Sequence, residues 1–279
     1  MVIDVTYACN MGCSHCMSDC KPDGQHMSIN TFKDVLNFLK KHDIPTWTFS
    51  GGEIFEHPDI FEILDVLEQM WDKKYPISFI TNGRALVRNK ALYDRVVKFK
   101  NYAGKRRFLM QITDDLRFYP DTLTQKEKFW LSKLADIIEP VPGNPKDKQQ
   151  CLYPQGRALV NHADANWYMV GPKCANTRLA TLQGINTIHG LVMHLFAAQK
   201  FCTPVIAPDG SIKLGESALC PSVASIYDDE RTVIEKIRNS NCKACKIAWD
   251  NLKEKQQLAY TILELQMEKV NAKKTQLGT

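Results

Sequence analysis

Hydrophobic residues in the first half of the chain follow two alternating spacings, one typical of helices and one typical of strands. Ser28 is a good helix-capping residue, and the apolar residues between Phe32 and Leu39 recur at helical spacing. Short runs rich in β-branched and aromatic residues are typical of strands. The pattern predicts strands at 2–7, 47–49, 77–80 and 108–112, and helices following Ser28, following Pro58, over 86–97 and over 123–138.

Strands that alternate with helices predict βαβ units, in which neighbouring strands are parallel. In such folds, ligands bind at the carboxyl ends of the strands. Unusual polar segments follow three of the predicted strands, at residues 50–53, 81–83 and 113–115. We therefore expect an α/β protein whose site lies at this edge of a parallel sheet.

The pattern changes after residue 201. Two short strand-like runs, 203–207 and 211–214, flank Pro208-Asp209-Gly210, which predicts a β-hairpin, and the chain from Glu230 onward has a helical pattern. We expect three parts: a core over residues 1–198, a small domain over 199–250, and a C-terminal helix with a polar tail over 251–279.

Composition narrows the class of protein. The 279 residues are 44% hydrophobic and 24% charged, which is typical of a globular chain. No stretch approaches the roughly 18 apolar residues that span a bilayer, and the N-terminus lacks the pattern of a signal peptide. The net charge of +5 is mild, and basic and acidic residues are mixed rather than striped. We expect a cytoplasmic protein without a membrane or nucleic-acid partner.

Three of the ten cysteines are clustered near the N-terminus, at Cys9, Cys13 and Cys16. The spacing is too tight for an ordinary disulfide framework, and clustered thiols in a reducing compartment suggest metal. A [4Fe–4S] cluster takes four ligands, so three thiolates from one loop leave one iron open. The alternatives are a partial zinc site or free thiols on a loop.

The Cys-x-x-x-Cys-x-x-Cys segment after the first strand of an α/β pattern resembles the radical S-adenosylmethionine (SAM) superfamily. His15 stands where that family commonly has an aromatic residue. The resemblance implies a partial (β/α)6 barrel and an open iron chelated by the amino and carboxylate groups of SAM. It also implies reductive cleavage of SAM to methionine and a 5′-deoxyadenosyl radical, which abstracts a hydrogen atom from the substrate.

The segment after the second strand, Ser50-Gly51-Gly52-Glu53, resembles the Gly-Gly-Glu motif of the same superfamily. Glycines allow the backbone to approach the ligand closely, and the Glu53 carboxylate can receive the SAM ammonium. Alone, Gly-Gly-Glu usually marks only a turn. Its place, about 35 residues beyond Cys16, is what strengthens the resemblance.

Three further positions are carried over from the resemblance. Asn82 belongs to a Thr-Asn-Gly segment after the third strand, and Thr113 matches the fourth-strand position that contacts the SAM ribose, with Asp115 as a weaker candidate. Arg157 lies in a Pro-x-Gly-Arg segment and is expected to hold the SAM carboxylate, because a guanidinium suits bidentate carboxylate binding. The alternative for Arg157 is an ordinary surface arginine.

A second set of cysteines lies in the C-terminal third. Cys202, Gly215 and Cys220 fit the spacing CX9–15GX4C of SPASM and twitch domains, and Cys242 and Cys245 add two thiols. Four thiolates complete the ligands of an auxiliary [4Fe–4S] cluster. Since no cysteine follows Cys245, the shorter twitch type is expected; a zinc ribbon is the alternative.

The remaining cysteines, Cys20, Cys151 and Cys174, have no evident partner and are expected to be small buried side chains, although Cys174 is also a candidate for the substrate cavity. The histidines His162, His189 and His194 are expected to be structural, and an acid–base role is the alternative.

The resemblance implies a radical SAM enzyme that modifies a peptide or protein side chain, in the manner of the maturases of ribosomally made peptides. A flavodoxin or ferredoxin is the expected reductant. Because the chain starts at the first barrel strand, no N-terminal leader-binding domain is expected. The alternatives are radical oxidation of a small polar molecule, an aminocyclitol or a nucleotide, and a zinc-stabilised binding protein.

Overall fold

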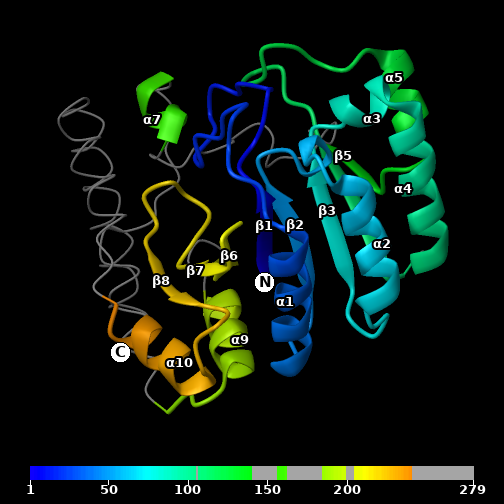
Figure 1. The fold of residues 1–279 in the computed structure, drawn as a ribbon. Coiled ribbons are helices and arrows are strands. Elements are labelled where there is room, and N and C mark those ends of the chain that lie inside the picture. The colour runs from blue at the N-terminus through cyan, green and yellow to red at the C-terminus, as the bar shows by residue number, and fades with distance from the viewer. Residues whose placement is uncertain (105, 140–155, 162–183, 199–203, 241–279) are drawn as a thin grey trace, which may run out of the picture.

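An eight-stranded sheet organises the part of the chain that the structure, a computed structural model, describes: residues 1–104, 106–139, 156–161, 184–198 and 204–240 (Figure 1). The strand order is β5-β4-β3-β2-β1-β6-β7-β8. The strands are β1 (Val2–Thr6), β2 (Trp47–Gly51), β3 (Ile77–Thr81), β4 (Phe108–Thr113), β5 (Ile137–Glu139), β6 (Val205–Ile206), β7 (Ser211–Lys213) and β8 (Ser222–Ser225). The helices are α1 (Ile29–Lys41), the 3₁₀ turn η1 (Ile54–Glu56), α2 (Ile60–Met70), α3 (Arg84–Arg88), α4 (Lys90–Ala103), α5 (Gln125–Leu131), α7 (Gly156–Asn161), α9 (Ile188–Ala198) and α10 (Glu230–Arg238).

The first five strands confirm the predicted α/β architecture. Each of the pairs β1–β2, β2–β3, β3–β4 and β4–β5 is parallel, so the carboxyl ends of all five strands lie at one edge. The described strands form an open row rather than a closed barrel, as a partial barrel requires. A sixth parallel strand, β6, lies on the other side of β1 and belongs to the predicted hairpin.

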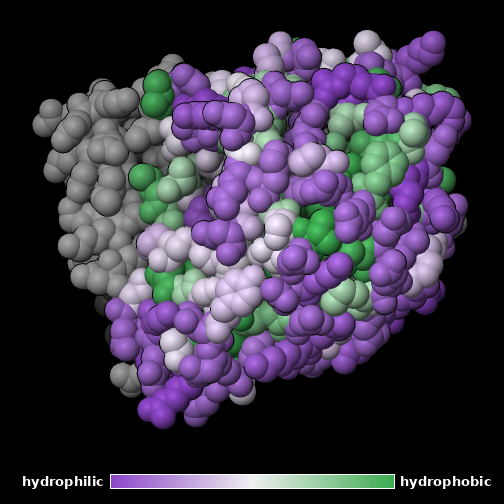
Figure 2. Space-filling view, viewed as in Figure 1, coloured by the Kyte–Doolittle hydropathy of each residue, from purple (hydrophilic) through white to green (hydrophobic). Residues whose placement is uncertain are grey.

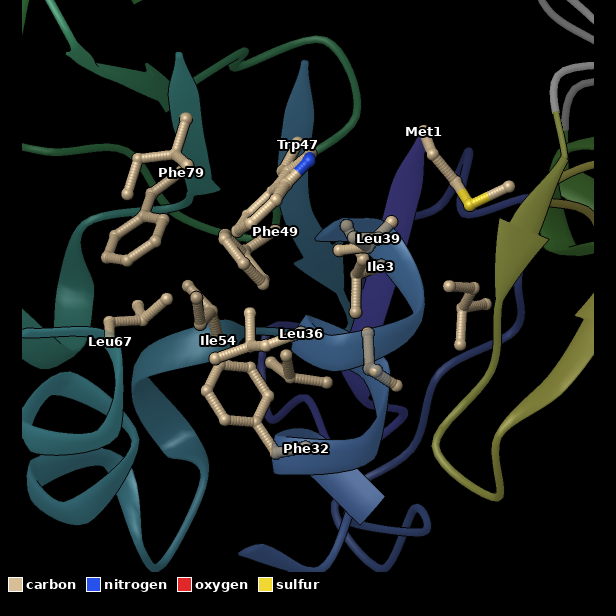
Figure 3. Packing of buried hydrophobic residues seen from close by; sticks show 14 of the residues in the cluster. Met1, Ile3, Phe32, Leu36, Leu39, Trp47, Phe49, Ile54, Leu67 and Phe79 are labelled. Atoms are coloured by element: carbon tan, nitrogen blue, oxygen red, sulfur yellow. The ribbon is translucent and has the colours of Figure 1, made fainter. Parts of the chain in front are cut away.

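Alternation of side chains along the strands explains where the core lies. Phe49 in β2 and Phe79 in β3 are fully buried and pack against each other, and Phe49 also packs against Phe32 of α1 in the cluster that includes Leu36 (Figure 3). Their neighbours on the opposite face of the sheet are polar and only half-buried, as Ser78 shows. Because successive side chains of a strand point to opposite faces, one face packs against helices and the other stays polar.

Side chains that cap helices decide where the helices begin and end. Ser28 accepts a hydrogen bond from the Thr31 backbone at 3.1 Å and starts α1, as predicted. The single helix predicted over 86–97 is wrong, because two helices, α3 and α4, meet at Asn89. The Asn89 side chain accepts a hydrogen bond from the Leu92 backbone at 3.1 Å, so it caps a new helix instead of continuing the old one.

The helix predicted over 123–138 is wrong in its second half. A capping box between Thr124 and Glu127 starts α5, but this helix ends at Leu131 and the chain then forms β5. Asp136 favours this change, because its carboxylate accepts a hydrogen bond from the Met110 backbone of β4 at 2.8 Å. The same carboxylate forms an ion pair with Lys100. Pairing with the edge of the sheet therefore outweighs the helical pattern.

The predicted hairpin is present and continues the sheet. Strands β6 and β7 are antiparallel, and Gly210 turns the chain between them with a φ of +81°. Because β6 pairs with β1, the hairpin stands directly beside the strand that leads into the cysteine loop.

The outer face seen in Figure 2 is mostly hydrophilic over α1, α2 and α4, with small separate hydrophobic patches. Among the described helices, none is long and apolar enough to cross a bilayer.

Candidate active site

One cavity of about 230 Å³ opens where the strands β1 to β4 end. It brings together eleven residues that the sequence suggested from five separate segments. These are Cys9, Cys13, His15, Cys16, Ser50, Gly51, Gly52, Glu53, Asn82, Thr113 and Arg157. The parallel direction of the strands explains this convergence, because each strand delivers its polar segment to the same edge.

The cysteine loop leaves β1 and returns alongside it. Backbone hydrogen bonds close its base: Tyr7 N donates to Gln25 O at 2.8 Å, Cys9 N to Lys21 O at 2.9 Å, and Met27 N to Val5 O at 2.9 Å. The three thiols lie within the excursion between these bonds and line the cavity. The loop therefore has a fixed base, and its three thiols lie at the cavity.

The two glycines of the Gly-Gly-Glu segment permit a close approach to the cysteine loop. Gly52 N donates to Thr6 O at 2.7 Å and Glu53 N donates to Ala8 O at 2.9 Å. A Cβ atom on Gly52 would lie 2.2 Å from Ala8 O, so no larger residue fits without moving the backbone. The segment thus pairs with the chain directly before Cys9.

Glu53 is buried at the floor of the cavity, with only 1% of its surface exposed. Its carboxylate accepts hydrogen bonds from Thr81 Oγ1 at 2.6 Å, from the Phe55 backbone at 3.1 Å and from the Asn82 backbone at 2.7 Å. Burial raises the pKa of this carboxyl, while these donors act in the opposite direction. A carboxylate offers about four acceptor positions, so Glu53 retains one for a cation in the cavity.

Aromatic residues after β4 cover the other side of the cysteine loop. The ring of His15 lies 4.6 Å from that of Phe118 and 5.8 Å from that of Tyr119, centre to centre. Tyr119 OH donates to Thr113 Oγ1 at 2.6 Å, and burial raises the pKa of this phenol. The Thr113 hydroxyl therefore lies at the cavity wall with Tyr119 already bonded to it.

Five residues that line the cavity were not predicted: Met11, Cys20, Ile80, Thr81 and Tyr119. Tyr119 had a usable signal, since it lies six residues after Thr113 in a loop that follows a strand. Ile80 and Thr81 also had one, because they end the third strand next to Asn82.

Arg157 reaches the cysteine loop from α7. Its Nε donates to Cys13 O at 2.9 Å, and its Nη1 donates to Cys20 O at 2.9 Å and to Asp19 Oδ1 at 3.1 Å. It is therefore not an ordinary surface arginine. It lines the cavity, but these contacts use donors that binding of the SAM carboxylate was expected to use.

The thiols differ in their surroundings. Burial raises the pKa of Cys9, and it raises the pKa of Cys13 to about 12, where the neighbouring thiols Cys9 and Cys16 add to the effect. A hydrogen bond from Cys20 lowers the pKa of Cys16 to about 6. Cys20 is buried, as expected, but it also belongs to the cavity. The positive charge of Arg157 favours the thiolate at Cys9, Cys13 and Cys16 alike.

The donor set fits an iron–sulfur cluster better than a single metal ion. Within the described ranges, no three His, Cys, Asp or Glu side chains are placed to hold one ion. Cysteine thiolates are the usual ligands of a [4Fe–4S] cluster, which spreads its ligands over four separate irons. Three thiols around one cavity, with a carboxylate and polar backbone beside them, therefore suit a cluster with one open corner.

Of the second cysteine set, only Cys220 lies in the described part of the chain; Cys202, Cys242 and Cys245 lie outside it, as do Cys151, Cys174 and His162. Cys220 is buried in the loop between β7 and β8. That loop contacts the chain just after Cys16: Ala218 N donates to Met17 O at 3.1 Å, and Ser18 Oγ donates to Glu216 O at 2.7 Å. The loop that carries Cys220 is thus in direct contact with the cysteine loop.

Comparisons with known proteins point to the same chemistry. Residues 3–113 match the model of the Radical SAM superfamily. Over 90 residues, the chain is 34% identical to the antilisterial bacteriocin subtilosin biosynthesis protein AlbA of Bacillus subtilis (strain 168), an alignment covering 32% of this chain and 19% of AlbA. It is 32% identical over 81 residues to the mycofactocin maturase MftC of Mycobacterium tuberculosis (strain ATCC 25618 / H37Rv), covering 29% of this chain and 20% of MftC.

The aligned segments span about a fifth of these curated relatives. A solved structure described as native anSMEcpe with bound AdoMet and Cp18Cys peptide has a TM-score of 0.50 and 12% identity, and the match covers 95% of this chain and 98% of that one. At this identity the likeness concerns the fold alone, and it agrees with the α/β architecture described above.

Proposed function

We propose that this protein is an enzyme that reductively cleaves SAM and modifies a peptide or protein side chain, since residues 3–113 match the model of the Radical SAM superfamily. The observation that carries the proposal is the convergence of three cysteines and the Gly-Gly-Glu segment on one cavity. Within it, the loop fixed to β1 provides thiolates and Glu53 provides a buried acceptor.

In this proposal Cys9, Cys13 and Cys16 hold the [4Fe–4S] cluster that the superfamily implies. When bound, the cluster supplies the electron that splits SAM into methionine and a 5′-deoxyadenosyl radical. Glu53 accepts the SAM ammonium at its remaining acceptor position, beside Asn82. Thr113 and the ring of Tyr119 lie where the nucleoside is expected to bind, and His15 with its aromatic neighbours shields the thiolates from water.

We further propose that Cys202, Cys220, Cys242 and Cys245 hold an auxiliary cluster. The contacts of Ala218 and Glu216 with the cysteine loop support this assignment, because they bring the Cys220 segment against the first site. Such a cluster would have its four irons held by these cysteines, and when bound it would supply an acceptor for the electron of the substrate radical. The net reaction is then an oxidation, with a flavodoxin or ferredoxin as the reductant for the first cluster.

A peptide substrate is favoured by the relatives. AlbA is named for the biosynthesis of a bacteriocin, MftC is named a maturase, and the structure of matching fold contains a bound peptide. The polar face of the sheet next to the cavity includes Ser50 and Ser78. It suits a peptide substrate, because the backbone amides of a bound peptide need hydrogen-bond partners.

The test is made on protein purified without oxygen. We expect about eight irons per chain, by the stoichiometry of two cubane clusters, and 5′-deoxyadenosine when SAM and a strong reductant are added. Cys16→Ala is expected to abolish SAM cleavage, and mass spectrometry of candidate peptides encoded beside this gene is expected to show the modified side chain. Zinc without iron would overturn the enzyme assignment, and turnover of a small polar molecule alone would overturn the peptide assignment.

A further inference from the structure

Arg157 makes several hydrogen bonds to the cysteine loop, although it lies more than 130 residues further along the chain. Its guanidinium donates to two loop carbonyls, Cys13 O and Cys20 O, and to the Asp19 carboxylate between them. Its backbone N–H donates to Cys16 O at 2.9 Å. One residue thus bonds to the loop before, at and after its last cluster cysteine.

The hydrogens of the guanidinium can be counted against these contacts. Arginine has one N–H at Nε and two at each terminal nitrogen. Cys13 O takes the hydrogen on Nε, and Cys20 O with Asp19 Oδ1 takes both hydrogens on Nη1. A bidentate grip on a carboxylate needs one hydrogen from each of two neighbouring nitrogens. With Nε and Nη1 committed, Arg157 retains donors on Nη2 alone and cannot form that grip unless it releases the loop.

The rest of α7 reinforces the same contact. Gly156 has a φ of +58°, and a Cβ atom there would lie 2.5 Å from Cys16 O, so the start of the helix is pressed against the loop. Asn161 Nδ2, at the other end of the helix, donates to Ser14 O at 3.0 Å. Figure 1 shows α7 beside the N-terminal loop above the end of β1.

We propose that Arg157 is a positioning residue that, together with α7, clamps the loop from Cys13 to Cys20 so that its thiols keep the geometry that binds the cluster. The proposal replaces the expected role of Arg157 as the ligand of the SAM carboxylate. It rests on the proposed function only in assigning the cluster to these thiols. Residues outside the ligand set that hold ligands in place typically change metal affinity by about 10–100-fold when they are replaced.

Two substitutions distinguish a role of Arg157 in clamping the loop from a role in binding the SAM carboxylate. Arg157→Met keeps the apolar stem and removes every donor, whereas Arg157→Lys keeps the charge but cannot reproduce three bonds in a fork. With no SAM present, we expect a chelator to strip iron roughly tenfold faster from Arg157→Met than from the wild type, and at an intermediate rate from Arg157→Lys. The dissociation constant of SAM, measured on the fraction that keeps its cluster, is expected to change by less than about threefold, well below the tenfold that the loss of one bidentate partner implies.

Hydrogen exchange in the metal-free full chain gives a second readout. We expect the amides of residues 13–20 to exchange several-fold faster in Arg157→Met, and the same segment to respond less strongly to Asn161→Ala, which removes only the Ser14 contact. Arg231→Met, on the exposed face of α10, is the control and should match the wild type in every measurement.

Unchanged exchange and unchanged iron loss, with SAM binding weakened tenfold or more, would overturn the clamp and restore the carboxylate ligand. Should Arg157→Met fail to fold, Asn161→Ala and Arg157→Lys decide the question by exchange in the same segment. Exchange also decides it when the wild-type chain binds no iron, a result that counts against the proposed function instead.

Discussion

The parallel and antiparallel parts of the sheet reach the same edge of the molecule in different ways. From β1 to β5 all strands run in one direction, so several consecutive strands end at the cavity and each contributes to it. From β6 to β8 the direction alternates, and the loop between β7 and β8, which carries Cys220, contacts the cysteine loop through Ala218 and Glu216. The first site is therefore built from many short backbone contacts, whereas the second cysteine segment approaches through one loop.

This difference predicts which activity is lost when each part of the sheet is altered by substitution. The first site depends on backbones that pass closer than any side chain allows, as the Gly52 segment and Ala8 do. Within the described ranges, the β7–β8 loop meets the cysteine loop through hydrogen bonds at Met17 and Ser18. Damage to the parallel part should remove all activity, and damage to the hairpin part should remove only the later steps.

The largest effect is expected from Gly52→Ala. The new Cβ would lie 2.2 Å from Ala8 O, so the Gly-Gly-Glu segment must separate from the chain before Cys9 and the bonds to Thr6 and Ala8 are lost. We expect loss of the cluster, no 5′-deoxyadenosine, and a free energy of unfolding lower by about 2–4 kcal/mol, as for other overpacked backbone sites. Iron analysis and urea unfolding measure both changes.

Gly104→Ala is the matched control, because Gly104 has a φ of +83° but no atom within 4 Å of the added Cβ. It should lose about 1–3 kcal/mol to backbone strain, because its φ of +83° and ψ of +149° favour glycine, and it should keep its iron. If Gly52→Ala behaves in the same way as Gly104→Ala, the close approach is not what assembles the site.

A more selective loss is expected from Cys220→Ala. Removing one ligand of the proposed auxiliary cluster should lower the iron content from about eight to about four per chain. Formation of 5′-deoxyadenosine should persist, since Cys9, Cys13 and Cys16 are untouched, while modified peptide no longer accumulates. Leu219→Ala changes the exposed neighbour in the same loop and should retain both products. Full product formation in Cys220→Ala would refute the auxiliary role.

The same comparison shows what the sequence can predict. Strand and helix positions in the parallel part follow from the local spacing of apolar residues. Buried side chains such as Phe49 alternate with less buried ones along a strand, and buried side chains such as Phe32 recur every three to four residues along a helix. The site residues from Cys9 to Thr113 could be selected because they directly follow those strands. The hairpin could be predicted for a similar reason, since Pro208-Asp209-Gly210 is a local turn signal.

What the sequence did not predict depends on contacts between distant segments. Residues 137–139 become a strand because Asp136 bonds to the Met110 backbone, a partner 26 positions away. Tyr119 enters the cavity through its bond to Thr113, and Arg157 reaches Cys13 across 144 positions. Contacts between residues so far apart in the chain leave no local sequence pattern. Elements could therefore be predicted where the local pattern determines the structure, but not where a tertiary hydrogen bond determines it.

The smallest effect on activity, and the most informative about the junction of the two parts, is expected from Asp4→Asn. Asp4 lies on β1, beside Lys213 of β7 and Glu216 of the β7–β8 loop, and Tyr7 hydrogen-bonds to it. Burial raises the pKa of Asp4 from 3.8 to about 8, and the charge of Glu216 adds to the rise. The folded chain thus keeps a proton on Asp4 at a pH where the unfolded chain has released it.

The sign of the pH dependence follows from this proton. Between about pH 4 and pH 8 the unfolded state binds fewer protons at Asp4, so its contribution to stability falls as the pH rises. Since each pKa unit is worth about 1.4 kcal/mol, the rise from 3.8 to about 8 sets an upper limit of about 6 kcal/mol on the whole change. We expect Asp4→Asn, which cannot ionise, to gain stability relative to the wild type between pH 5 and pH 8. Urea unfolding of the metal-free chain measures this gain, with the exposed Asp23→Asn as a control that shows none. An equal difference at both pH values would mean that Asp4 is already ionised and paired with Lys213, so that an ion pair rather than a neutral carboxyl joins the parallel part to the hairpin.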